Sequence, residues 1–600
     1  MRISSRELRE KWLCYYESKG HKNIGSVSLI GDGETGVMFN VAGMQPLMPY
    51  LLGEKEHEMG KRLCNIQGCI RTVDIDNVGD ESHFTFFEMM GNWSLGDYFK
   101  REKVAYSIEL LTKVFGLKKE KICSTVFAGK GEIPRDNETE KLLLENGIKK
   151  ENIYFTDENW WNLEGLDNTP CGPDNEWFYP KNEDKCCEAC DINCSCGRYV
   201  EIGNDVYMEY KQLSGGRLEE LSQKNVDTGF GFERMLTFLN GISDPYQTDL
   251  FEKAIERIEK ECNVKYGKDE GTTRQIRIIC DHVRTAVMLI GDEKGIVPSN
   301  VGAGYILRRL MRRAIRYIMN FGAGPSLMKG LAEDFVDIYG EVYPNLNEKK
   351  AHILSEIDRE FSKFEKTLVQ GNKEFEKLIS NMKKFAPDVK VISGSKAFKL
   401  FDTFGFPVEL TLEMAKENGF DVDLEGFNAA FKEHQEKSKI SAGTFKGGLI
   451  DSSEENAKLH TATHLLLAAL NKVLGGGIVQ KGSNITPERL RFDFNYPEKL
   501  TQEQLKEIED EVNKNISNDI PVVCENMTLG QARNSGATGV FGDKYGEDVS
   551  VYTIGDVSRE ICGGPHAKST GQLGKFKIIK EESSSAGVRR IKAILEKSQN

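Results

Sequence analysis

The sequence has no run of about 18 apolar residues, the length that a membrane-spanning helix needs. Its first residues, MRISSRELREKWLCYYESKGHKN, mix charged with aromatic side chains and contain no apolar signal-peptide core. The chain also lacks internal repeats, low-complexity tracts and the GxxxxGK[ST] loop of P-loop nucleotide-binding proteins. These absences argue against a membrane-spanning, secreted or P-loop protein. We therefore expect a cytoplasmic protein with no membrane partner.

Positive charge is scarce, because 80 Lys and Arg residues stand against 93 Asp and Glu residues, which gives a net charge of −13. Such a chain has no global attraction to nucleic acid, so a contact of that kind needs a local basic patch. The 39% hydrophobic and 29% charged residues are typical of a globular protein, and 600 residues exceed a single core. Fourteen cysteines without a secretory signal indicate thiols and metal sites rather than disulfides.

The patterns along the chain predict an α+β multidomain protein. Residues 1–243 mix strand-like runs with turn residues and aromatics, which indicates a domain built around a sheet, and residues 181–198 form a cysteine-rich insertion in it. Residues 244–440 have the three- and four-residue apolar spacing of amphipathic helices. Residues 441–456 are rich in Gly and Ser and predict a linker. Residues 457–600 open with an apolar helix and then alternate strands with helices.

Two pairs of potential zinc ligands lie in this last part. His460 and His464 are four residues apart among strong helix formers, so both project from one helix face. Neutral imidazoles placed in this way can bind one Zn²⁺ at roughly 2.0–2.1 Å. Cys562 and His566 repeat the spacing around two glycines, which completes a His₃Cys set. The set could bind zinc with all four ligands or with three and a water, while HTATH alone could also be two histidines in a core.

The histidine pair does not predict a zinc protease. HTATH lacks the glutamate of the HExxH motif, so there is no obvious base for that chemistry.

A second cluster of cysteines lies in KCCEACDINCSCGRY. Its members are Cys186, Cys187, Cys190, Cys194 and Cys196. Four thiolates at such short spacing are typical of a closed structural zinc site, although a catalytic or redox role and an iron–sulfur cluster are alternatives. Cys186, Cys190, Cys194 and Cys196 form the more regular series, with Cys187 as the spare or the substitute.

Candidate nucleotide-binding segments come from the first domain. GDGETG (31–36) matches GxGxxG but neither follows a clear strand nor opens a helix, so we interpret it as a turn. CIRTVDIDNVGDESHFTFFEMMGNWS predicts a hairpin with Arg71 at the end of its first arm, which could hold a phosphate and a purine. On its second arm one face carries His83, Thr85, Phe87 and Met89, and the other carries Phe84, Phe86 and Glu88. The alternative is an ordinary amphipathic hairpin.

Two more segments could line a pocket. In VDTGFGFERML, glycines at a strand-to-helix turn let the backbone approach a ligand, and Asp227, Glu233 and Arg234 supply charge. The alternative is a surface salt pair on a helix. The aromatic and Pro/Gly-rich stretch ENWWNLEGLDNTPCGPDNEW could form a wall.

Together these segments resemble the alanyl-tRNA synthetases, a family of class II aminoacyl-tRNA synthetases. The motifs that carry the resemblance, in the family's order, are TFFEMMGNWSLGDYFK, PCGP, VDTGFGFER, PSNVGAGYILRRLMRRAIR, FDTFGFPVEL, HTATHLL, QKGS…LRFDF, CGGPH and GVRRI. The resemblance implies an antiparallel-sheet catalytic domain of class II, a helical tRNA-recognition domain and an α/β editing domain that contains zinc. It also implies that ATP and alanine form alanyl-adenylate, from which the alanyl group passes to tRNA(Ala).

The resemblance assigns three catalytic residues. Arg71 matches the arginine that holds the ATP α-phosphate, Arg234 matches the arginine at the other end of ATP, and Asp227 matches the carboxylate that pairs with the alanine ammonium. Mg²⁺ would accompany the phosphates. The other implied ATP-binding residues are His83, Phe87, Glu88, Met89 and Gly231. The other implied alanine-binding residues are Trp161, Asn204, Val206 and Gly229.

In the helical region the family recognises a G·U wobble pair in the acceptor stem. The residues that match this role are Asn300, Arg309, Arg313 and Asp402. With Arg312 and Arg316, the arginines of LRRLMRRAIR would supply the local basic patch, and a solvated helix face is their alternative interpretation.

A second, hydrolytic site is expected on energetic grounds. An alanine pocket distinguishes glycine by one methyl group, worth about 1–3 kcal/mol, and rejects the added hydroxyl of serine by only about 10². Accurate translation needs the correct amino acid to be favoured by roughly 10⁴–10⁵-fold. The resemblance assigns this editing of Ser-tRNA(Ala) and Gly-tRNA(Ala) to the His₃Cys set, with Gln480 and Cys562 as editing residues.

The sequence also departs from the family pattern. The connection between FDTFGFPVEL and HTATH is too short for the β-barrel that the family usually has there. The sequence stops soon after GVRRI, from which we expect a monomer with weaker tRNA affinity. Pro565 stands where threonine is more usual, and many members lack the cysteine cluster.

Two other functions are consistent with parts of the sequence. One is a hydrolase that clears mischarged tRNA in trans and has an inactive synthetase core, against which the intact Arg71, Asp227 and Arg234 argue. The other is a non-enzymatic, zinc-stabilised RNA-binding protein.

Overall fold

A computed structural model describes most of the chain. The described residues are 2–31, 37–163, 166–182, 184–442, 454–486, 488–538, 548–585 and 587–596. Most of the predicted turn 31–36 and of the predicted linker 441–456 therefore lies outside the described residues. Within the described residues, no helix combines the length and the apolar character that crossing a membrane requires.

The contacts divide the chain into two compact units. The first unit comprises Met1–Lys390 and Lys399–Asp421, and the second comprises Val391–Phe398 and Val422–Asn600. The boundary predicted between the catalytic and helical domains, at residue 243, lies inside the first unit and stays a prediction.

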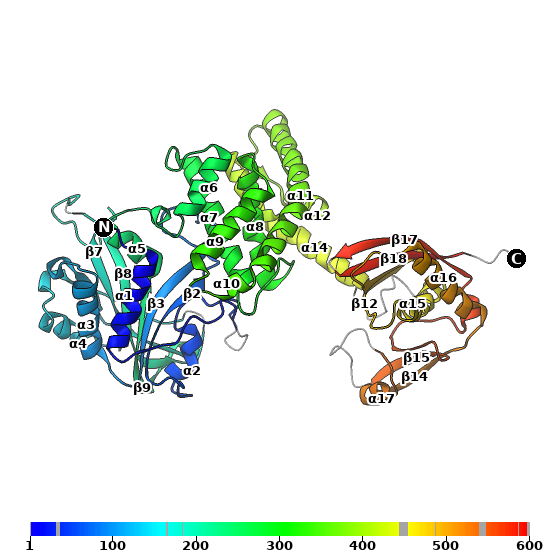
Figure 1. Ribbon diagram of the computed structural model, residues 1–600, viewed down its shortest axis with the longest axis horizontal. Coiled ribbons are helices and arrows are strands. Elements are labelled where there is room, and N and C mark those ends of the chain that lie inside the picture. The colour runs from blue at the N-terminus through cyan, green and yellow to red at the C-terminus, as the bar shows by residue number, and fades with distance from the viewer. Residues whose placement is uncertain are drawn as a thin grey trace. The chain divides into compact units, whose positions relative to one another are not determined.

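The first unit is built around a mostly antiparallel sheet, of which Figure 1 labels β2, β3, β7, β8 and β9. Its strand order is β1-β2-β3-β9-β8-β7-β4-β5, and β6 pairs with β7. The strands are β1 (Lys22–Asn23), β2 (Arg62–Ile70), β3 (Phe86–Leu95), β4 (Cys123–Phe127), β5 (Ile153–Thr156), β6 (Trp160–Trp161), β7 (Thr169–Pro180), β8 (Tyr199–Gln212) and β9 (Leu218–Gly231). Two pairs, β1–β2 and β4–β5, are parallel. The predicted antiparallel class II sheet is confirmed.

Helices cover this sheet. α1 (Ser5–Ser18) starts at a capping box formed by Ser4 and Glu7, and its Trp12 indole donates to the Gly91 carbonyl at 3.4 Å. The Trp12 ring lies 5.4 Å from that of Phe230 in β9, which fixes α1 on the strands that carry the site. The other short helices of this region are α2 (Met48–Leu51), α3 (Lys100–Glu109), α4 (Asn137–Glu145) and α5 (Phe232–Leu239).

The predicted helical region follows the sheet. Its helices are α6 (Glu252–Cys262), α7 (Glu270–Gly291), α8 (Gly302–Asn320), α9 (Pro325–Tyr339), α10 (Asn345–Glu348), α11 (Lys350–Phe385), α12 (Gly394–Phe404), α13 (Val408–Glu417) and α14 (Leu424–Ala442). Two short strands also occur, β10 (Val391–Ile392) and β11 (Asp421–Val422).

Buried polar contacts join the helices to the sheet. Arg284 of α7 is fully buried, donates to Glu233 Oε1 at 2.9 Å and to the Tyr339 hydroxyl at 3.1 Å, and contacts the Phe86 carbonyl. Asp281 accepts from the Thr85 N–H at 3.0 Å. Because a buried charge that loses its partner costs about 3–5 kcal/mol, these contacts hold β3 and α5 firmly.

The second unit contains a four-stranded sheet of order β12-β13-β18-β17 and a three-stranded sheet of order β14-β15-β16. Besides β10 and α14, its elements are α15 (Glu454–Val473), β12 (Gln480–Thr486), β13 (Arg489–Asn495), α16 (Gln502–Ser517), β14 (Val522–Thr528), α17 (Leu529–Asn534), β15 (Asp548–Ile554), β16 (Ser558–Ile561), β17 (Lys575–Ser585) and β18 (Val588–Glu596).

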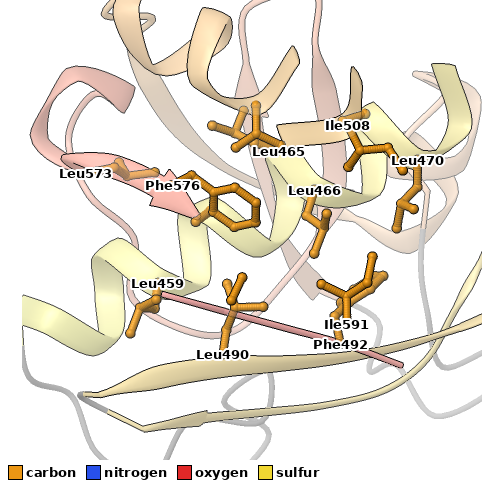
Figure 2. Close-up of a cluster of buried hydrophobic side chains, with 14 of the residues drawn as sticks. Leu459, Leu465, Leu466, Leu470, Leu490, Phe492, Ile508, Leu573, Phe576 and Ile591 are labelled. Atoms are coloured by element: carbon orange, nitrogen blue, oxygen red, sulfur yellow. The ribbon is translucent and has the colours of Figure 1, made fainter. Parts of the chain in front are cut away.

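Leucines of α15 form the core of this unit. Figure 2 shows Leu459, Leu466 and Leu470 between α15 and the sheet residues Phe492 and Ile591. His460 and His464 lie on the same helix, so packing of the leucines fixes the direction of the two imidazoles.

Candidate active site and metal centres

A cavity of about 820 Å³ lies against β3, β8 and β9. Its lining includes these predicted ATP- and alanine-binding residues: Arg71, His83, Phe87, Met89, Asn204, Gly229, Gly231 and Arg234. The sheet therefore brings together side chains that are more than a hundred residues apart in the sequence.

Arg71 follows β2 at the end of the β2–β3 hairpin where the connecting segment begins. Its N–H donates to the Thr85 carbonyl at 2.9 Å, and its exposed guanidinium lies 4.8 Å from the centre of the Phe87 ring. His83, nearby on the cavity wall, has Nδ1 2.5 Å from Asp80 Oδ2. The cavity thus has a cation beside an aromatic face, an arrangement suited to a phosphate and a purine.

Arg234 lies in the first turn of α5, at another side of the same cavity. Its guanidinium donates to Glu201 Oε2 at 3.0 Å and to the Glu201 carbonyl at 3.2 Å. Glu201 comes from β8 and also lines the cavity. Arg71 and Arg234 therefore face one cavity, as binding the two ends of a nucleotide requires.

The predicted alanine-binding residues lie opposite one another on β8 and β9. Val206 pairs with Asp227 and Asn204 with Gly229, and Trp161 packs with Val206 in one hydrophobic cluster. A Cβ on Gly229 would be 3.1 Å from Asn204 Oδ1 and 3.3 Å from Met89 Sδ, so a side chain there would narrow the cavity.

Asp227 is not on the cavity lining but lies two residues from Gly229 along β9, opposite Trp93 of β3. It is 6% exposed. Burial raises its pKa to about 7, while the nearby Trp93 indole and the Lys103 ammonium act in the opposite direction. A carboxylate that is costly to ionise can be stabilised by an incoming ammonium.

Glu88 does not line the cavity. It is fully buried, pairs with Arg9 of α1 and accepts from the Tyr343 hydroxyl at 3.0 Å. Because alternate residues of a strand face opposite sides, Glu88 faces away from Phe87 and Met89. The structure thus places it behind the sheet, away from the predicted adenine position.

Three of the predicted tRNA-binding residues are already engaged in contacts. Arg309 pairs with the exposed Asp76 at 2.7 Å, and Asn300, which is exposed, contacts Arg308. Arg313 is 5% exposed and donates to Glu413 at 2.8 Å and to the Ile75 carbonyl at 2.6 Å. Asp402 is exposed on α12.

The arginine-rich helix face is therefore not an open basic patch. Burial would raise the pKa of Glu413, but Arg313 and Arg316 beside it hold the value at about 2. Arg312 pairs with Glu360 at 2.8 Å. Helices α11 and α13 thus neutralise much of the charge that the sequence shows on α8.

Within the described residues, two groups of side chains could hold a metal ion, and both coincide with the predicted sets. In the second unit the group is His460, His464, Cys562 and His566, with all ligand atoms within 4.8 Å of one another. The Cys562 Sγ lies 3.4 Å from His460 Nε2. Ligands of a tetrahedral zinc ion with these donors are about 3.6 Å apart, given Zn–S and Zn–N bonds of about 2.3 and 2.05 Å.

Hydrogen bonds at Nδ1 orient His460 and His566, while His464 Nδ1 makes no hydrogen bond among the described residues. His460 Nδ1 donates to the Pro565 carbonyl at 3.1 Å, and His566 Nδ1 donates to Thr461 Oγ1 at 3.1 Å. His464 Nδ1 lies 3.3 Å from Glu560 Oε1. His566 Nε2 is buried and has no hydrogen-bond partner in the described part, which fits a metal ligand.

Burial also favours the neutral, ligating form of these imidazoles. It lowers the pKa of His460 to about 3 and that of His464 to about 4. Proline at position 565 is compatible with the site, because the residue contributes its carbonyl and not an N–H. The second predicted editing residue, Gln480, begins β12 and donates to Ser483 at 2.9 Å.

In the first unit the metal-binding group is Cys186, Cys190, Cys194 and Cys196, in the connection between β7 and β8. Cys187 is not part of it. All 14 cysteines are free thiols.

Sequence patterns missed several residues that shape these sites. Glu201 and Lys181 line the cavity, Thr461 and Pro565 hydrogen-bond His566 and His460, and Glu560 lies beside His464. Thr461 lies inside HTATH and Glu560 two residues before Cys562, so proximity to the ligands was an available signal. The sequence contained no such signal for Lys181, because the position of this residue on the cavity lining depends on strand pairing.

Comparisons with known proteins agree with this architecture. Residues 7–475 match the family model "tRNA synthetases class II (A)", and residues 549–592 match the "Threonyl and Alanyl tRNA synthetase second additional domain". The alanine–tRNA ligase of Borrelia hermsii (strain HS1 / DAH) is 50% identical over 595 residues, covering 98% of this chain and 99% of that protein. That of Treponema pallidum (strain Nichols) is 47% identical, with 99% of each chain covered.

A more distant relative differs in length. The alanine–tRNA ligase of Thermotoga maritima (strain ATCC 43589 / DSM 3109 / JCM 10099 / NBRC 100826 / MSB8) is 35% identical, covering 99% of this chain and 80% of that protein. The matched stretch runs over 710 residues, although this chain has 600, so the relative carries additional internal sequence. From its cavity, its metal-binding groups and these similarities, the chain belongs to the alanine–tRNA ligase family of class II tRNA synthetases.

Proposed function

We propose that the first unit activates alanine with ATP and transfers it to tRNA(Ala), and that the second unit hydrolyses Ser-tRNA(Ala) and Gly-tRNA(Ala). The observation that carries the first part is the shared cavity, whose lining includes Arg71, Arg234, Asn204 and Gly229. Membership of the alanine–tRNA ligase family supports both parts.

In the activation step, an oxygen of the alanine carboxylate attacks the α-phosphorus of ATP and pyrophosphate leaves. Negative charge builds on the α-phosphate, and the fixed guanidinium of Arg71 opposes it. Phe87 and Met89 offer an apolar surface for the purine. Mg²⁺ would enter with ATP and neutralise its phosphates, and Glu81 and Glu201 on the lining offer the oxygen ligands it prefers.

Alanine selection depends on residues next to the cavity, on the same face of β8 and β9 as Asn204 and Gly229. Asp227 pairs with the substrate ammonium, Val206 and Trp161 form the apolar wall, and Gly229 leaves room for one methyl group. The cross-strand pairs of β8 and β9, the apolar cluster of Trp161 and Val206 and the short distances around Gly229 support these roles.

The alanine site should depend on pH. Because the pKa of Asp227 is about 7 and an ammonium pairs with the ionised carboxylate, kcat/KM for alanine in pyrophosphate exchange should fall as the pH drops through about 7. Below that pKa the ionised fraction falls about tenfold per pH unit. The measurement is exchange against alanine concentration from pH 8 to pH 5.5. Asp227→Asn should remove this dependence and raise KM for alanine, and a flat wild-type profile would contradict the role of Asp227.

Editing follows from the His₃Cys group. A zinc ion bound there would supply Lewis-acid polarisation of the ester that joins serine or glycine to the tRNA. The protein holds the imidazoles of His460 and His566 through hydrogen bonds to Pro565 and Thr461, places Glu560 beside His464, and favours the neutral imidazoles by burial. Zinc is also the metal that best fits the four cysteines of the first unit.

The remaining assignments are proposals of the same kind. Asn300, Arg309, Arg313 and Asp402 would contact the acceptor stem, which requires tRNA to replace partners such as Asp76. We expect a monomer that acts in the cytoplasm, where thiols stay reduced.

Aminoacylation tests the proposal directly. The purified chain should show alanine-dependent exchange of pyrophosphate into ATP, charge tRNA(Ala) with alanine, and release serine from Ser-tRNA(Ala). A chain that clears Ser-tRNA(Ala) but shows no exchange would be a trans-editing hydrolase, and RNA binding without either reaction would overturn both parts.

A further inference from the structure

The connection between β7 and β8 combines a metal-binding group with one edge of the ATP cavity. Among its cysteines, the Cys186 and Cys194 Sγ atoms are 3.3 Å apart and those of Cys190 and Cys196 are 3.7 Å apart. A tetrahedral ZnS₄ centre with bonds of about 2.3 Å places its sulfurs about 3.8 Å apart. The four thiols are thus already near the positions that zinc requires.

This cysteine group closes the hairpin next to its last strand pairs. Pro180 of β7 pairs with Tyr199 of β8. Beyond that pair, the Lys181 N–H donates to the Arg198 carbonyl at 2.8 Å, and Arg198 Nε donates to the Asn182 carbonyl at 3.2 Å. Cys196 lies two residues before Arg198. A metal bound by the cysteines would therefore fix the backbone of Lys181 and Asn182 from the other side.

Lys181 and Asn182 line the ATP cavity together with Val200 and Glu201. The Lys181 side chain is exposed, and its ammonium makes no ion pair or hydrogen bond among the described residues. Arg234, in contrast, is paired with Glu201 at 3.0 Å. Lys181 is thus a cation on the lining that is available to a new anionic partner.

The charges on the lining explain why this cation matters. The carboxylates of Asp74, Glu81, Glu201 and Glu233 oppose the cationic groups Arg71, Lys181 and Arg234. A triphosphate entering this cavity needs every cation that can approach it, because each charge-assisted contact is about twice as strong as a neutral hydrogen bond.

We propose that zinc held by Cys186, Cys190, Cys194 and Cys196 fixes the base of the β7–β8 hairpin, and that Lys181, positioned in this way, binds the phosphates of ATP. The inference rests on the proposed function in one respect, namely that the cavity binds ATP. It makes the cysteine group a positioning device for ATP binding, so that losing the metal weakens ATP binding and leaves the alanine site intact.

Metal content is the first measurement. The full-length wild type should contain two zinc ions per chain by elemental analysis, Cys194→Ser should retain one, and the matched control Cys187→Ser should retain two. A Cys194→Ser protein with both zinc ions, or iron with visible absorbance in the wild type, would overturn the assignment.

ATP binding is the second measurement. Lys181→Met should keep both zinc ions and raise the ATP dissociation constant, measured by equilibrium dialysis, and the KM for ATP by about tenfold, the effect of one charge-assisted contact. The KM for alanine should change less than twofold. Lys185→Met, an exposed lysine of the same connection that is not on the cavity lining, should match the wild type. An unchanged ATP dissociation constant in Lys181→Met would overturn the role of Lys181.

The double variant Cys194→Ser/Lys181→Met tests whether the metal acts on ATP binding through Lys181. If zinc acts by positioning Lys181, Cys194→Ser and Cys194→Ser/Lys181→Met should bind ATP equally weakly, whereas fully additive losses would refute the coupling. Unfolding of Cys194→Ser is checked by circular dichroism, and chelation with re-addition of zinc to the wild type gives an independent test. ATP that binds with the expected Lys181 dependence, but without alanine-dependent exchange, would refute the proposed function alone.

Discussion

Replacing Arg71 by alanine should lower the rate of alanine-dependent pyrophosphate exchange by roughly 10²–10³-fold, the effect of removing one preorganised group that stabilises transition-state charge. The guanidinium faces the cavity beside Phe87 and is exposed, so the variant should fold normally. Since the interaction strengthens as charge develops on the phosphate, kcat should fall more than the affinity for ATP.

The measurement is steady-state exchange with ATP and alanine varied separately. Arg71→Lys should recover part of the rate, because it restores the charge but not the planar fork. Arg6→Ala is the matched control, since Arg6 is exposed on α1 and pairs with Glu10 at the surface. Arg71→Ala with more than about a tenth of the wild-type rate would show that the α-phosphate binds elsewhere in the cavity.

Replacing Cys562 by alanine should lower hydrolysis of Ser-tRNA(Ala) by at least about 100-fold. Loss of a group that only orients a metal ligand costs about 10–100-fold in metal affinity or activity, and loss of a ligand should cost more. The remaining ligands are three histidines: His460 and His464 are buried, and His566, which is half-buried, has a buried Nε2 without a hydrogen-bond partner among the described residues.

Deacylation of preformed Ser-tRNA(Ala), with zinc content measured on the same sample, checks this outcome. Charging with alanine should be unchanged, because the first unit carries that reaction. Cys262→Ala, at the end of α6 in the first unit, is the control for loss of a thiol. Wild-type clearance of Ser-tRNA(Ala) by Cys562→Ala would refute the zinc-dependent editing site.

Sequence reasoning worked best where short-range rules decide the geometry. Alternation along the second arm of the hairpin placed Phe87 and Met89 on one face and Glu88 on the other, and the structure has this arrangement. The assignment of Glu88 to the adenine region came from the resemblance, and the alternation already pointed against it. The four-residue spacings of the histidines and of Cys562 and His566 likewise fixed which atoms could meet.

Sequence reasoning was weakest where the environment of a side chain depends on a residue far away in the sequence. Four of the five arginines in LRRLMRRAIR predicted a basic patch, but Glu413 of α13 and Glu360 of α11 neutralise much of it. No local pattern shows which acidic residues will pack against a helix, because that depends on how the helices cross.

The sequence by itself determined the chemistry of this protein: the hairpin with Arg71, the two metal-binding sets and the motif order of the family all follow from residue type and spacing. Only the tertiary structure decided which charges are free to act. Strand pairing brought Lys181 to the same cavity as Arg71 and placed Asp227 two residues from Gly229 on the same face of the sheet, and helix packing paired Arg313 with Glu413. The physical reason is that spacing constrains neighbours within a turn or a strand, whereas burial and charge pairing depend on residues that only the folded chain brings together.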